Sequence, residues 1–182
     1  MKPNFKHYGS IDITPFLSAL ESISSDDWDT YTYRQDAFHM HSQTKTIPIL
    51  YDEHYTPKMG KKSSFYNLFE DSINHARKVI SELTDTECKI IRFIITNLPA
   101  NTIVKSHKDS AHSFKVYNRV HIPLITNDKV LFTVGEETIN MPVGEMYEIN
   151  NGDSFHGVVN KGDADRLHII LDWRNAKPKN LI

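Results

Sequence analysis

Two patterns of apolar residues divide the chain near residue 88. Before it, apolar positions recur three or four residues apart at 14–23 and 64–83, with irregular polar segments elsewhere. That spacing places apolar side chains on one face of a helix, and Thr14 followed by Pro15 is typical of an N-cap with proline at the first helical position. We therefore expect two amphipathic helices in this part of the chain.

After residue 88, short runs rich in β-branched residues alternate with turn sequences such as Asn151-Gly152 and Lys161-Gly162. Eight short strands at regular spacing favour a sandwich or barrel over a parallel sheet with helical crossovers. The expected strands are 89–96, 102–107, 119–126, 129–134, 138–141, 145–150, 155–160 and 166–173. The sequence predicts a single, mainly β domain over 1–182. In it, a helical and mixed flank at about 1–88 precedes a double-stranded β-helix (jelly roll, cupin-like) at about 89–175.

Composition and charge narrow the class of protein. Hydrophobic residues make up 39% of the chain and charged residues 24%, which is typical of a globular domain. The formal net charge of −2 gives no reason to expect nucleic acid or a membrane surface as a partner. Cys88 is the one cysteine, so no intrachain disulfide can form, and the first ten residues lack the apolar run of a signal peptide. We expect a cytoplasmic protein, and its oligomeric state stays open.

A metal site is indicated by His107-Lys108-Asp109, the one place where an acidic residue follows a histidine by two positions. In a strand these two side chains share a face, so both can bind one metal. His156, at the start of a later strand, is the candidate third ligand. Two histidines and one carboxylate form the facial triad that leaves positions open on Fe(II), whereas zinc prefers a closed site with more nitrogen or sulfur ligands. The set of donors favours iron.

Arg166 opens the last predicted strand, ten residues after His156. If the open metal positions take 2-oxoglutarate, its distal carboxylate needs a cation, and a guanidinium suits this role because it binds a carboxylate through two parallel hydrogen bonds. A salt bridge at the barrel rim is the alternative role for this arginine.

These motifs together resemble the aspartyl/asparaginyl β-hydroxylase family, which consists of Fe(II)/2-oxoglutarate oxygenases on a double-stranded β-helix. The resemblance covers about residues 90–173. It rests on His107-x-Asp109, Arg119-Val-His121-Ile-Pro-Leu, Gly144-Glu-Met-Tyr-Glu-Ile-Asn, His156 and Arg166-Leu-His-Ile-Ile-Leu-Asp172.

The resemblance implies roles for the motif residues. His107 and His156 match the iron ligands, and Arg166 matches the arginine that holds the distal carboxylate of 2-oxoglutarate. The other implied co-substrate contacts are Thr96, whose hydroxyl assists that arginine, and Arg119 and His121, near the iron-side carboxylate.

Asp109 departs from the vertebrate peptidyl members of the family, which lack the carboxylate ligand. In this respect the chain is similar to the free L-proline cis-hydroxylases. The presence of Asp109 argues against halogenation. The expected reaction is hydroxylation of an amino acid or amino-acid residue (Asp-, Asn- or Pro-like) with O₂, coupled to decarboxylation of 2-oxoglutarate to succinate.

Substrate binding is expected to involve the polar segment 31–41 and the loop 110–118, which follows the metal pair. Arg34 is the best candidate for binding a substrate carboxylate, and a solvated edge strand is the alternative for the segment. The other candidates are Gln35, His39 and His41 for the substrate, and Asn150, Asn151 and Asp153 for the surroundings of His156.

Two other functions stay open. One is a metal-binding cupin that does not use 2-oxoglutarate, against which Arg166 and Arg119 count. The other is a non-catalytic jelly-roll binding module, against which the complete set of metal ligands counts. The sequence does not determine the prime substrate or the position and stereochemistry of hydroxylation.

Overall fold

The computed structural model describes residues 2–56, 58–109 and 116–176. Its strands are β1 (Phe5–Ser10), β2 (Lys45–Tyr51), β3 (Lys61–Lys62), β4 (Cys88–Leu98), β5 (Thr102–His107), β6 (Asn118–Ile125), β7 (Val130–Val134), β8 (Glu137–Ile139), β9 (Glu145–Ile149), β10 (His156–Asn160) and β11 (Arg166–Asn175). Its helices are α1 (Thr14–Leu20), α2 (Tyr33–Ala37) and α3 (Glu70–Thr84), with 3₁₀ helices at Asp26–Asp29, His39–His41 and Tyr66–Phe69. None of the described helices is long and apolar enough to cross a membrane.

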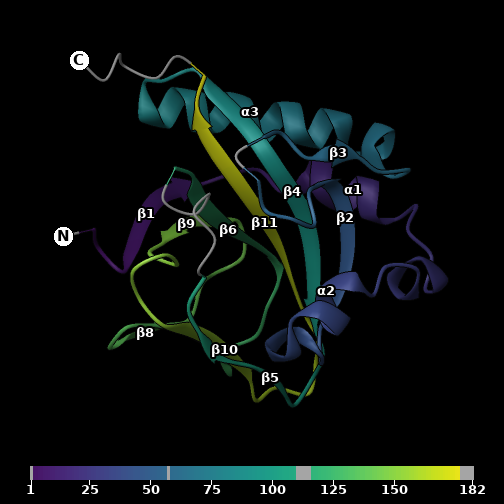
Figure 1. Ribbon diagram of the computed structural model, residues 1–182, viewed down its shortest axis with the longest axis vertical. Coiled ribbons are helices and arrows are strands. Elements are labelled where there is room, and N and C mark those ends of the chain that lie inside the picture. Colours follow the sequence, from purple (N-terminus) through teal and green to yellow (C-terminus); the bar gives the residue numbers. More distant parts are fainter. Residues whose placement is uncertain (1, 57, 110–115, 177–182) are drawn as a thin grey trace.

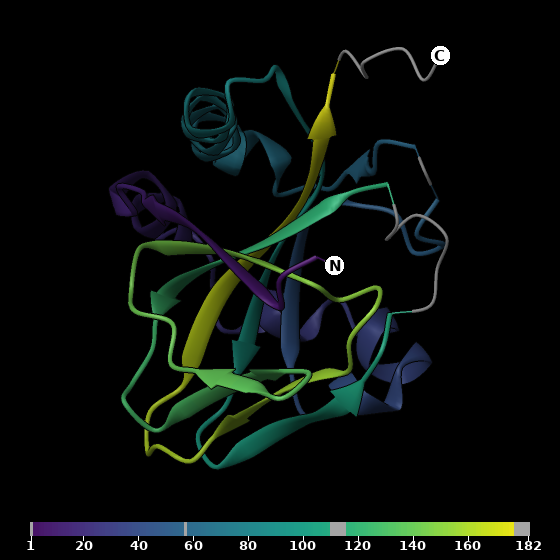
Figure 2. The same cartoon turned by 90° about the vertical axis from the view of Figure 1, so that its left-hand side faces the viewer.

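The described strands form two antiparallel sheets. The large sheet has the order β1-β9-β6-β11-β4-β2-β3, and the small sheet has the order β5-β10-β7-β8. Figure 2 shows the small sheet gathered at the base of the molecule, with α3 at the opposite end. This arrangement confirms the predicted mainly β, jelly-roll fold.

The helices α1 and α3 cover one face of the large sheet (Figure 1). Ile73, Ala76 and Ile80 lie three or four residues apart on α3 and are buried. They belong to the same apolar cluster as Phe93 and Ile95 of β4. Packing of α3 therefore orders the central strands, whose other face looks toward the small sheet.

The space between the sheets is apolar at one end and polar at the other. A smaller cluster that includes Leu98, Val104, Phe132 and Val158 fills the apolar end. Side chains alternate along a strand, so residues two apart on β4, β6 and β11 face this space together. The buried polar residues among them are Arg92, Thr96, His121, Arg166, His168 and Asp172.

Three strands before residue 88 differ from the sequence expectation. β1, β2 and β3 all belong to the large sheet, and β2 pairs directly with β4. Pro48 lies inside β2, where it lowers the strand signal of the sequence. The register shifts between Pro48 and Leu50, and such an irregularity is where a sheet tolerates proline.

Both predicted helices exist, with corrected ends. Thr14 is not the N-cap of α1: the helix begins at Thr14, whose backbone N–H donates to Asp12 Oδ1 at 2.9 Å, and it ends at Leu20 rather than at residue 23. The second predicted helix, 64–83, is a 3₁₀ turn at Tyr66–Phe69 followed by α3.

Candidate metal centre

His107, Asp109 and His156 come together as the sequence predicts. His107 ends β5 and His156 begins β10, and the two residues are partners in the ladder that joins these strands. One possible ligand atom from each of the three residues lies within 4.8 Å of the others. The Nε2 atoms of His107 and His156 are 3.9 and 4.0 Å from the carboxylate of Asp109. This is the donor set of a facial triad.

Gly157 allows the close strand approach that places the two histidines opposite each other. The register of β10 against β5 shifts between His156 and Val158. A Cβ atom at Gly157 would lie 2.9 Å from the carbonyl oxygen of Val104 and 3.1 Å from the backbone nitrogen of Ser106. A larger residue would therefore separate the strands beside the ligands.

The two histidines are held in forms that suit metal binding. Nδ1 of His107 donates to the Lys105 carbonyl oxygen at 2.8 Å, which leaves Nε2 to face Asp109 and His156. Burial lowers the pKa of His156 to about 4, so its ring is neutral at pH 7. A neutral imidazole is the form that binds a metal.

Asp109 is positioned by Asn151 and Arg119. The Asn151 side chain donates to Asp109 Oδ2 at 2.7 Å, and the backbone N–H of Asp109 donates to the Asn151 carbonyl oxygen at 3.1 Å. Arg119 Nη1 donates to the same Oδ2 at 2.7 Å. Burial raises the pKa of Asp109, but Arg119 and His156 outweigh it and hold that pKa below its usual value. The Asp109 carboxylate is therefore anionic, and its Oδ2 already accepts two hydrogen bonds.

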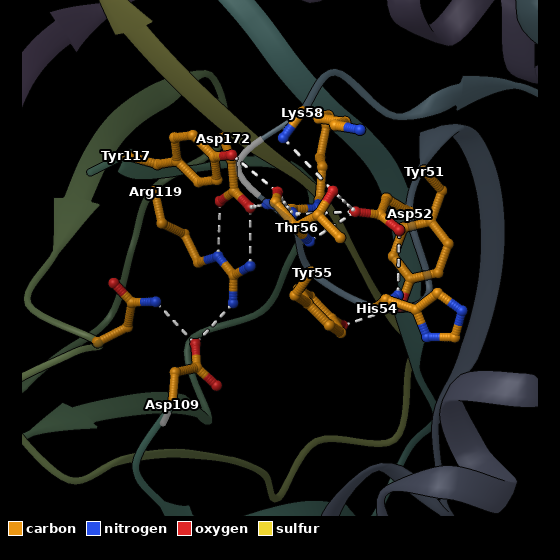
Figure 3. A network of polar contacts seen from close by, with 12 residues as sticks. Tyr51, Asp52, His54, Tyr55, Thr56, Lys58, Asp109, Tyr117, Arg119 and Asp172 are labelled. Atoms are coloured by element: carbon orange, nitrogen blue, oxygen red, sulfur yellow. Dashed lines mark hydrogen bonds and ion pairs between the residues drawn. The ribbon is translucent and has the colours of Figure 1, made fainter. Parts of the chain in front are cut away.

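Arg119 belongs to a row of charges across three strands. Asp172 of β11 is directly opposite Arg119 of β6 on one side and Arg92 of β4 on the other. Arg119 donates to Asp172 through Nε at 2.8 Å and Nη2 at 3.0 Å, and Arg92 Nη1 donates to Asp172 at 3.1 Å. Figure 3 shows Arg119 between Asp172 and Asp109. Arg119 therefore donates hydrogen bonds to two acids of the protein, next to the expected co-substrate site.

Arg166 lies in an inner pocket with an empty volume of about 480 Å³. The pocket is lined by Arg34, His41, Thr44, Thr96, Val104, His107, Arg119, His121, Phe132, His156, Gly157, Val158, Arg166 and Ile170. Arg166 is 3% exposed, its Nη2 donates to His168 Nδ1 at 2.6 Å, and its Nε has no partner among the described residues. Burial lowers its pKa to about 9. No described acidic residue forms an ion pair with it, so the rim salt bridge is not observed.

The remaining predicted co-substrate residues line the same pocket. Both ring nitrogens of His121 are buried and lack partners among the described residues, and burial lowers the pKa of this ring. The Thr96 hydroxyl donates to the His168 carbonyl oxygen at 3.4 Å. Thus Thr96 lies in the pocket with Arg166, although its hydroxyl donates to the backbone of β11.

The predicted substrate residues separate into two groups. Arg34 is buried and Gln35 is half-buried, with Gln35 donating to the Thr44 carbonyl oxygen at 2.9 Å. His39 is exposed and lies on a 3₁₀ helix with His41, so the two do not share a strand face. His41, rather than His39, contacts the centre, with its ring 5.2 Å from that of His107.

An outer pocket, with an empty volume of about 810 Å³, adjoins the inner one. It is lined by Arg34, Phe38, Met40, His41, Glu53, His54, Tyr55, His107, Lys108, Asp109 and Arg119. Of the loop 110–118 that was expected to bind substrate, residues 110–115 lie outside the described part of the chain.

Sequence reasoning named two residues that lie away from the ligands and missed two that matter. Asp153 is exposed, and the side chain of Asn150 donates to the Ser154 hydroxyl at 3.4 Å instead of to a ligand. Asp172 and His168 were not singled out. Their alternation with Arg166 along β11 was the available signal, because residues two apart on a strand face one side.

Comparison with known proteins agrees with this fold. A 2OG-Fe(II) oxygenase family oxidoreductase from Burkholderia pseudomallei is similar in structure, with a TM-score of 0.58 and 16% identity over 72% of this chain. The match covers 66% of that chain, just under two thirds of its length. A protein described as a non-heme monooxygenase, ThoJ-Ni complex, is similar with a TM-score of 0.53 and 13% identity, over 94% of this chain and 74% of the other. No curated protein matches the chain.

A sequence profile described as aspartyl/asparaginyl beta-hydroxylase matches residues 16–176, which is most of the chain. The match extends well before the motifs that carry the resemblance and includes the strand β2 and the helices α2 and α3. The chain belongs to the aspartyl/asparaginyl β-hydroxylase family.

Proposed function

We propose that the protein is an Fe(II)- and 2-oxoglutarate-dependent oxygenase that hydroxylates an amino acid or an amino-acid residue. The observation that carries the proposal is a cluster of His107, Asp109 and His156 whose two histidines line the same pocket as Arg166, a buried arginine with no acidic partner among the described residues. The residues present fit both groups. The triad leaves metal positions open for a co-substrate, and Arg166 offers a guanidinium for a carboxylate.

The buried polar atoms of the inner pocket support 2-oxoglutarate in particular. Arg166 Nε and both nitrogens of His121 lack partners among the described residues. A buried donor without a partner costs free energy, so a ligand that accepts from these groups would remove that cost. A dicarboxylate that reaches from the metal to Arg166 is a ligand of this kind.

Iron and 2-oxoglutarate, when bound, supply the activation of dioxygen and the oxidation of a substrate C–H bond. The residues of the chain bind and orient these groups. His107, Asp109 and His156 hold the metal, and Arg166 holds the distal carboxylate of the co-substrate. Val104, Phe132 and Ile170 give the pocket apolar walls that exclude water from the reaction.

Arg119 lines the inner pocket, near which the family resemblance implies a co-substrate contact, and its hydrogen bonds support a second role. Because it donates to Asp109 Oδ2 and to both oxygens of Asp172, it orients the carboxylate ligand. We infer that Arg119 is a positioning residue for Asp109, and that His121 is the neighbour on β6 that faces the co-substrate.

The experiment is an anaerobic titration of the metal-free protein with Fe(II) and then 2-oxoglutarate. The visible charge-transfer band that arises when the keto acid chelates iron is the readout. We expect the band in the wild type and its loss in His107→Ala. His39→Ala, which removes an exposed histidine of the neighbouring segment, is the matched control and should keep the band.

Iron binding without the band would contradict the use of 2-oxoglutarate and favour the metal-binding cupin. A band without succinate formation in air, over a wide range of amino acids and peptides, would favour the non-catalytic module. Arg166→Ala should keep iron binding but need far more 2-oxoglutarate for the band.

A further inference from the structure

Arg34 is a buried cation at the junction of the pockets around the metal centre. It is 6% exposed and lines both the inner and the outer pocket. Its Nη2 donates to His41 Nε2 at 3.1 Å, and its Nε has no partner among the described residues. An imidazole carries no negative charge in any of its ordinary forms, so His41 does not balance the charge of Arg34.

No described acidic residue forms an ion pair with Arg34. Residues 110–115, which follow Asp109 in the sequence and lie outside the described residues, include no Asp or Glu. Arg166 is likewise without an acidic partner among the described residues, whereas Arg92 and Arg119 both pair with Asp172. A buried charge without a counter-ion is costly, and such a group marks a place where a ligand supplies the opposite charge.

The charged groups around the metal centre would keep a net positive charge with the co-substrate bound, which favours a second anion. The negative charges of Asp109 and Asp172 balance the positive charges of Arg119 and Arg92. The Asp52 carboxylate also lies 3.8 Å from Arg92. Arg34, Arg166 and a divalent metal bring four positive charges. Dianionic 2-oxoglutarate offsets two of these charges and Asp52 at most one more. Glu53 and Lys108, which both line the outer pocket, offset each other, so at least one positive charge remains.

The pockets that Arg34 and Arg166 line indicate which carboxylate each arginine binds. Arg166 belongs to the inner pocket alone, where the distal carboxylate of 2-oxoglutarate is proposed to bind. Arg34 also faces the outer pocket, with Phe38 and Tyr55 as aromatic walls and Glu53 as an acid on the outer side. A molecule that enters by the outer pocket meets Arg34 next to the ligand His107.

We propose that the prime substrate is a small molecule with a free carboxylate, and that Arg34 binds this carboxylate at the inner end of the outer pocket. This inference rests on the proposed oxygenase function and adds the chemical class of its substrate. Arg34 is thereby a specificity-determining residue. Its forked guanidinium fixes the orientation of the carboxylate, and so the C–H bond that faces the metal.

The experiment compares the wild type with Arg34→Met, Arg34→Lys and the surface control Lys129→Met in two assays. The first is the anaerobic titration with Fe(II) and 2-oxoglutarate. The second measures succinate formation stimulated by the standard L-amino acids and by the corresponding L-amino-acid amides, which lack the carboxylate. Thermal unfolding of each variant without ligands reports whether it folds.

We expect every variant to show the charge-transfer band at the same 2-oxoglutarate concentration as the wild type. At least one free acid should stimulate the wild type, and its amide should be at least about 10-fold weaker. Arg34→Met should raise the KM of that acid about 10- to 100-fold, with Arg34→Lys between the two. Because Arg34→Met removes an unpaired buried charge, its unfolding temperature should equal or exceed that of the wild type.

Several results would overturn the assignment. If Arg34→Met needs much more 2-oxoglutarate for the band, Arg34 holds the co-substrate instead. Equal stimulation by acids and amides, or no stimulation by any free acid, excludes a carboxylate as the recognised group. An absent band in the wild type is a different failure, which removes the proposed function and this inference together.

Discussion

Asp172→Asn tests the buried charge row with the least change in shape. The Asp172 carboxylate is 1% exposed and accepts three hydrogen bonds from Arg92 and Arg119. An amide keeps the size of the side chain but removes the charge. It also turns one acceptor into a donor that faces a guanidinium donor. The two arginines then stay buried with less opposite charge around them.

The expected loss of stability is large. Removing one partner of a buried ion pair costs about 3–5 kcal/mol, because the other charge stays buried without compensation. Asp109 still pairs with Arg119 at 2.7 Å and Asp52 lies 3.8 Å from Arg92, so the loss should stay within this range although two arginines are affected. A natural domain has only about 5–15 kcal/mol of net stability, so the variant should unfold at far lower denaturant.

The same change should weaken metal binding. With Asp172 neutral, Asp109 is the remaining charged partner of Arg119, which competes more strongly with the metal for that carboxylate. Loss of a group that orients a metal ligand costs about 10- to 100-fold in affinity. Urea unfolding followed by circular dichroism measures the stability, and competition with a chelator for Fe(II) or Co(II) measures the affinity.

Asp163→Asn is the matched control. It makes the same chemical change in a pair with Lys129 that is 3.8 Å long and whose acid is 95% exposed. An exposed pair contributes at most about 1 kcal/mol, so this variant should resemble the wild type in both assays. If Asp172→Asn lost less than about 1 kcal/mol and kept full metal affinity, the row of charges would have neither the structural nor the positioning role given to it here.

Three further predictions concern the strands and the buried histidines. Gly157→Ala should weaken metal binding at least about 10-fold by separating the strands beside His156, measured by the same competition and contradicted by unchanged affinity. Asn160 is fully buried and bonds to three backbone carbonyl oxygens, so Asn160→Ala should cost about 3 kcal/mol in urea unfolding; a loss below about 1 kcal/mol would count against this role. Burial holds the pKa values of His121 and His168 far below 6.5, so the unfolded chain takes up more protons than the folded one as pH falls. Stability should therefore be full above pH 6.5 and decrease below it by about 1.4 kcal/mol per pH unit for each histidine, and a flat profile of urea midpoints from pH 7 to 5 would refute this.

The sequence predicted the strands of the second half well, because their periodicity is local. β5, β7 and β10 begin and end within about one residue of the expected positions. β1 and β2 were missed for different reasons. β2 has a proline in its interior, and β1 is an edge strand with mostly polar or half-buried residues, so neither has the alternation that marks a strand.

In the candidate site, too, local contacts could be predicted from the sequence, whereas contacts between distant residues could not. His107 and Asp109 could be paired from sequence because residues two apart on an extended chain face one side, although Asp109 lies two residues beyond the end of β5. The hydrogen-bond partners of Arg119 could not be predicted in this way. Asp172 is 53 residues away, and the choice of partner depends on the register of β11 against β6, which no local pattern specifies. The family resemblance therefore implied a contact between Arg119 and the co-substrate, but it did not reveal the hydrogen bonds of Arg119 to Asp172 and Asp109.

The charge row also connects the metal ligand to the outer pocket. Arg92 donates to the Thr56 carbonyl oxygen at 2.8 Å, and so does the Tyr117 hydroxyl at 2.8 Å. Thr56 follows Glu53, His54 and Tyr55, which line the outer pocket, and Figure 3 shows this segment beside the charge row.

A continuous series of contacts thus runs from the wall of the outer pocket through Arg92, Asp172 and Arg119 to Asp109. The same buried carboxylate holds the arginine that orients the metal ligand and the arginine that anchors the pocket wall. Substitution of Asp172 should therefore change substrate affinity as well as metal affinity. Substitution of Arg34, which takes no part in these contacts, should change substrate affinity alone. This difference separates the residue proposed to bind the substrate from the residues that build the site around it.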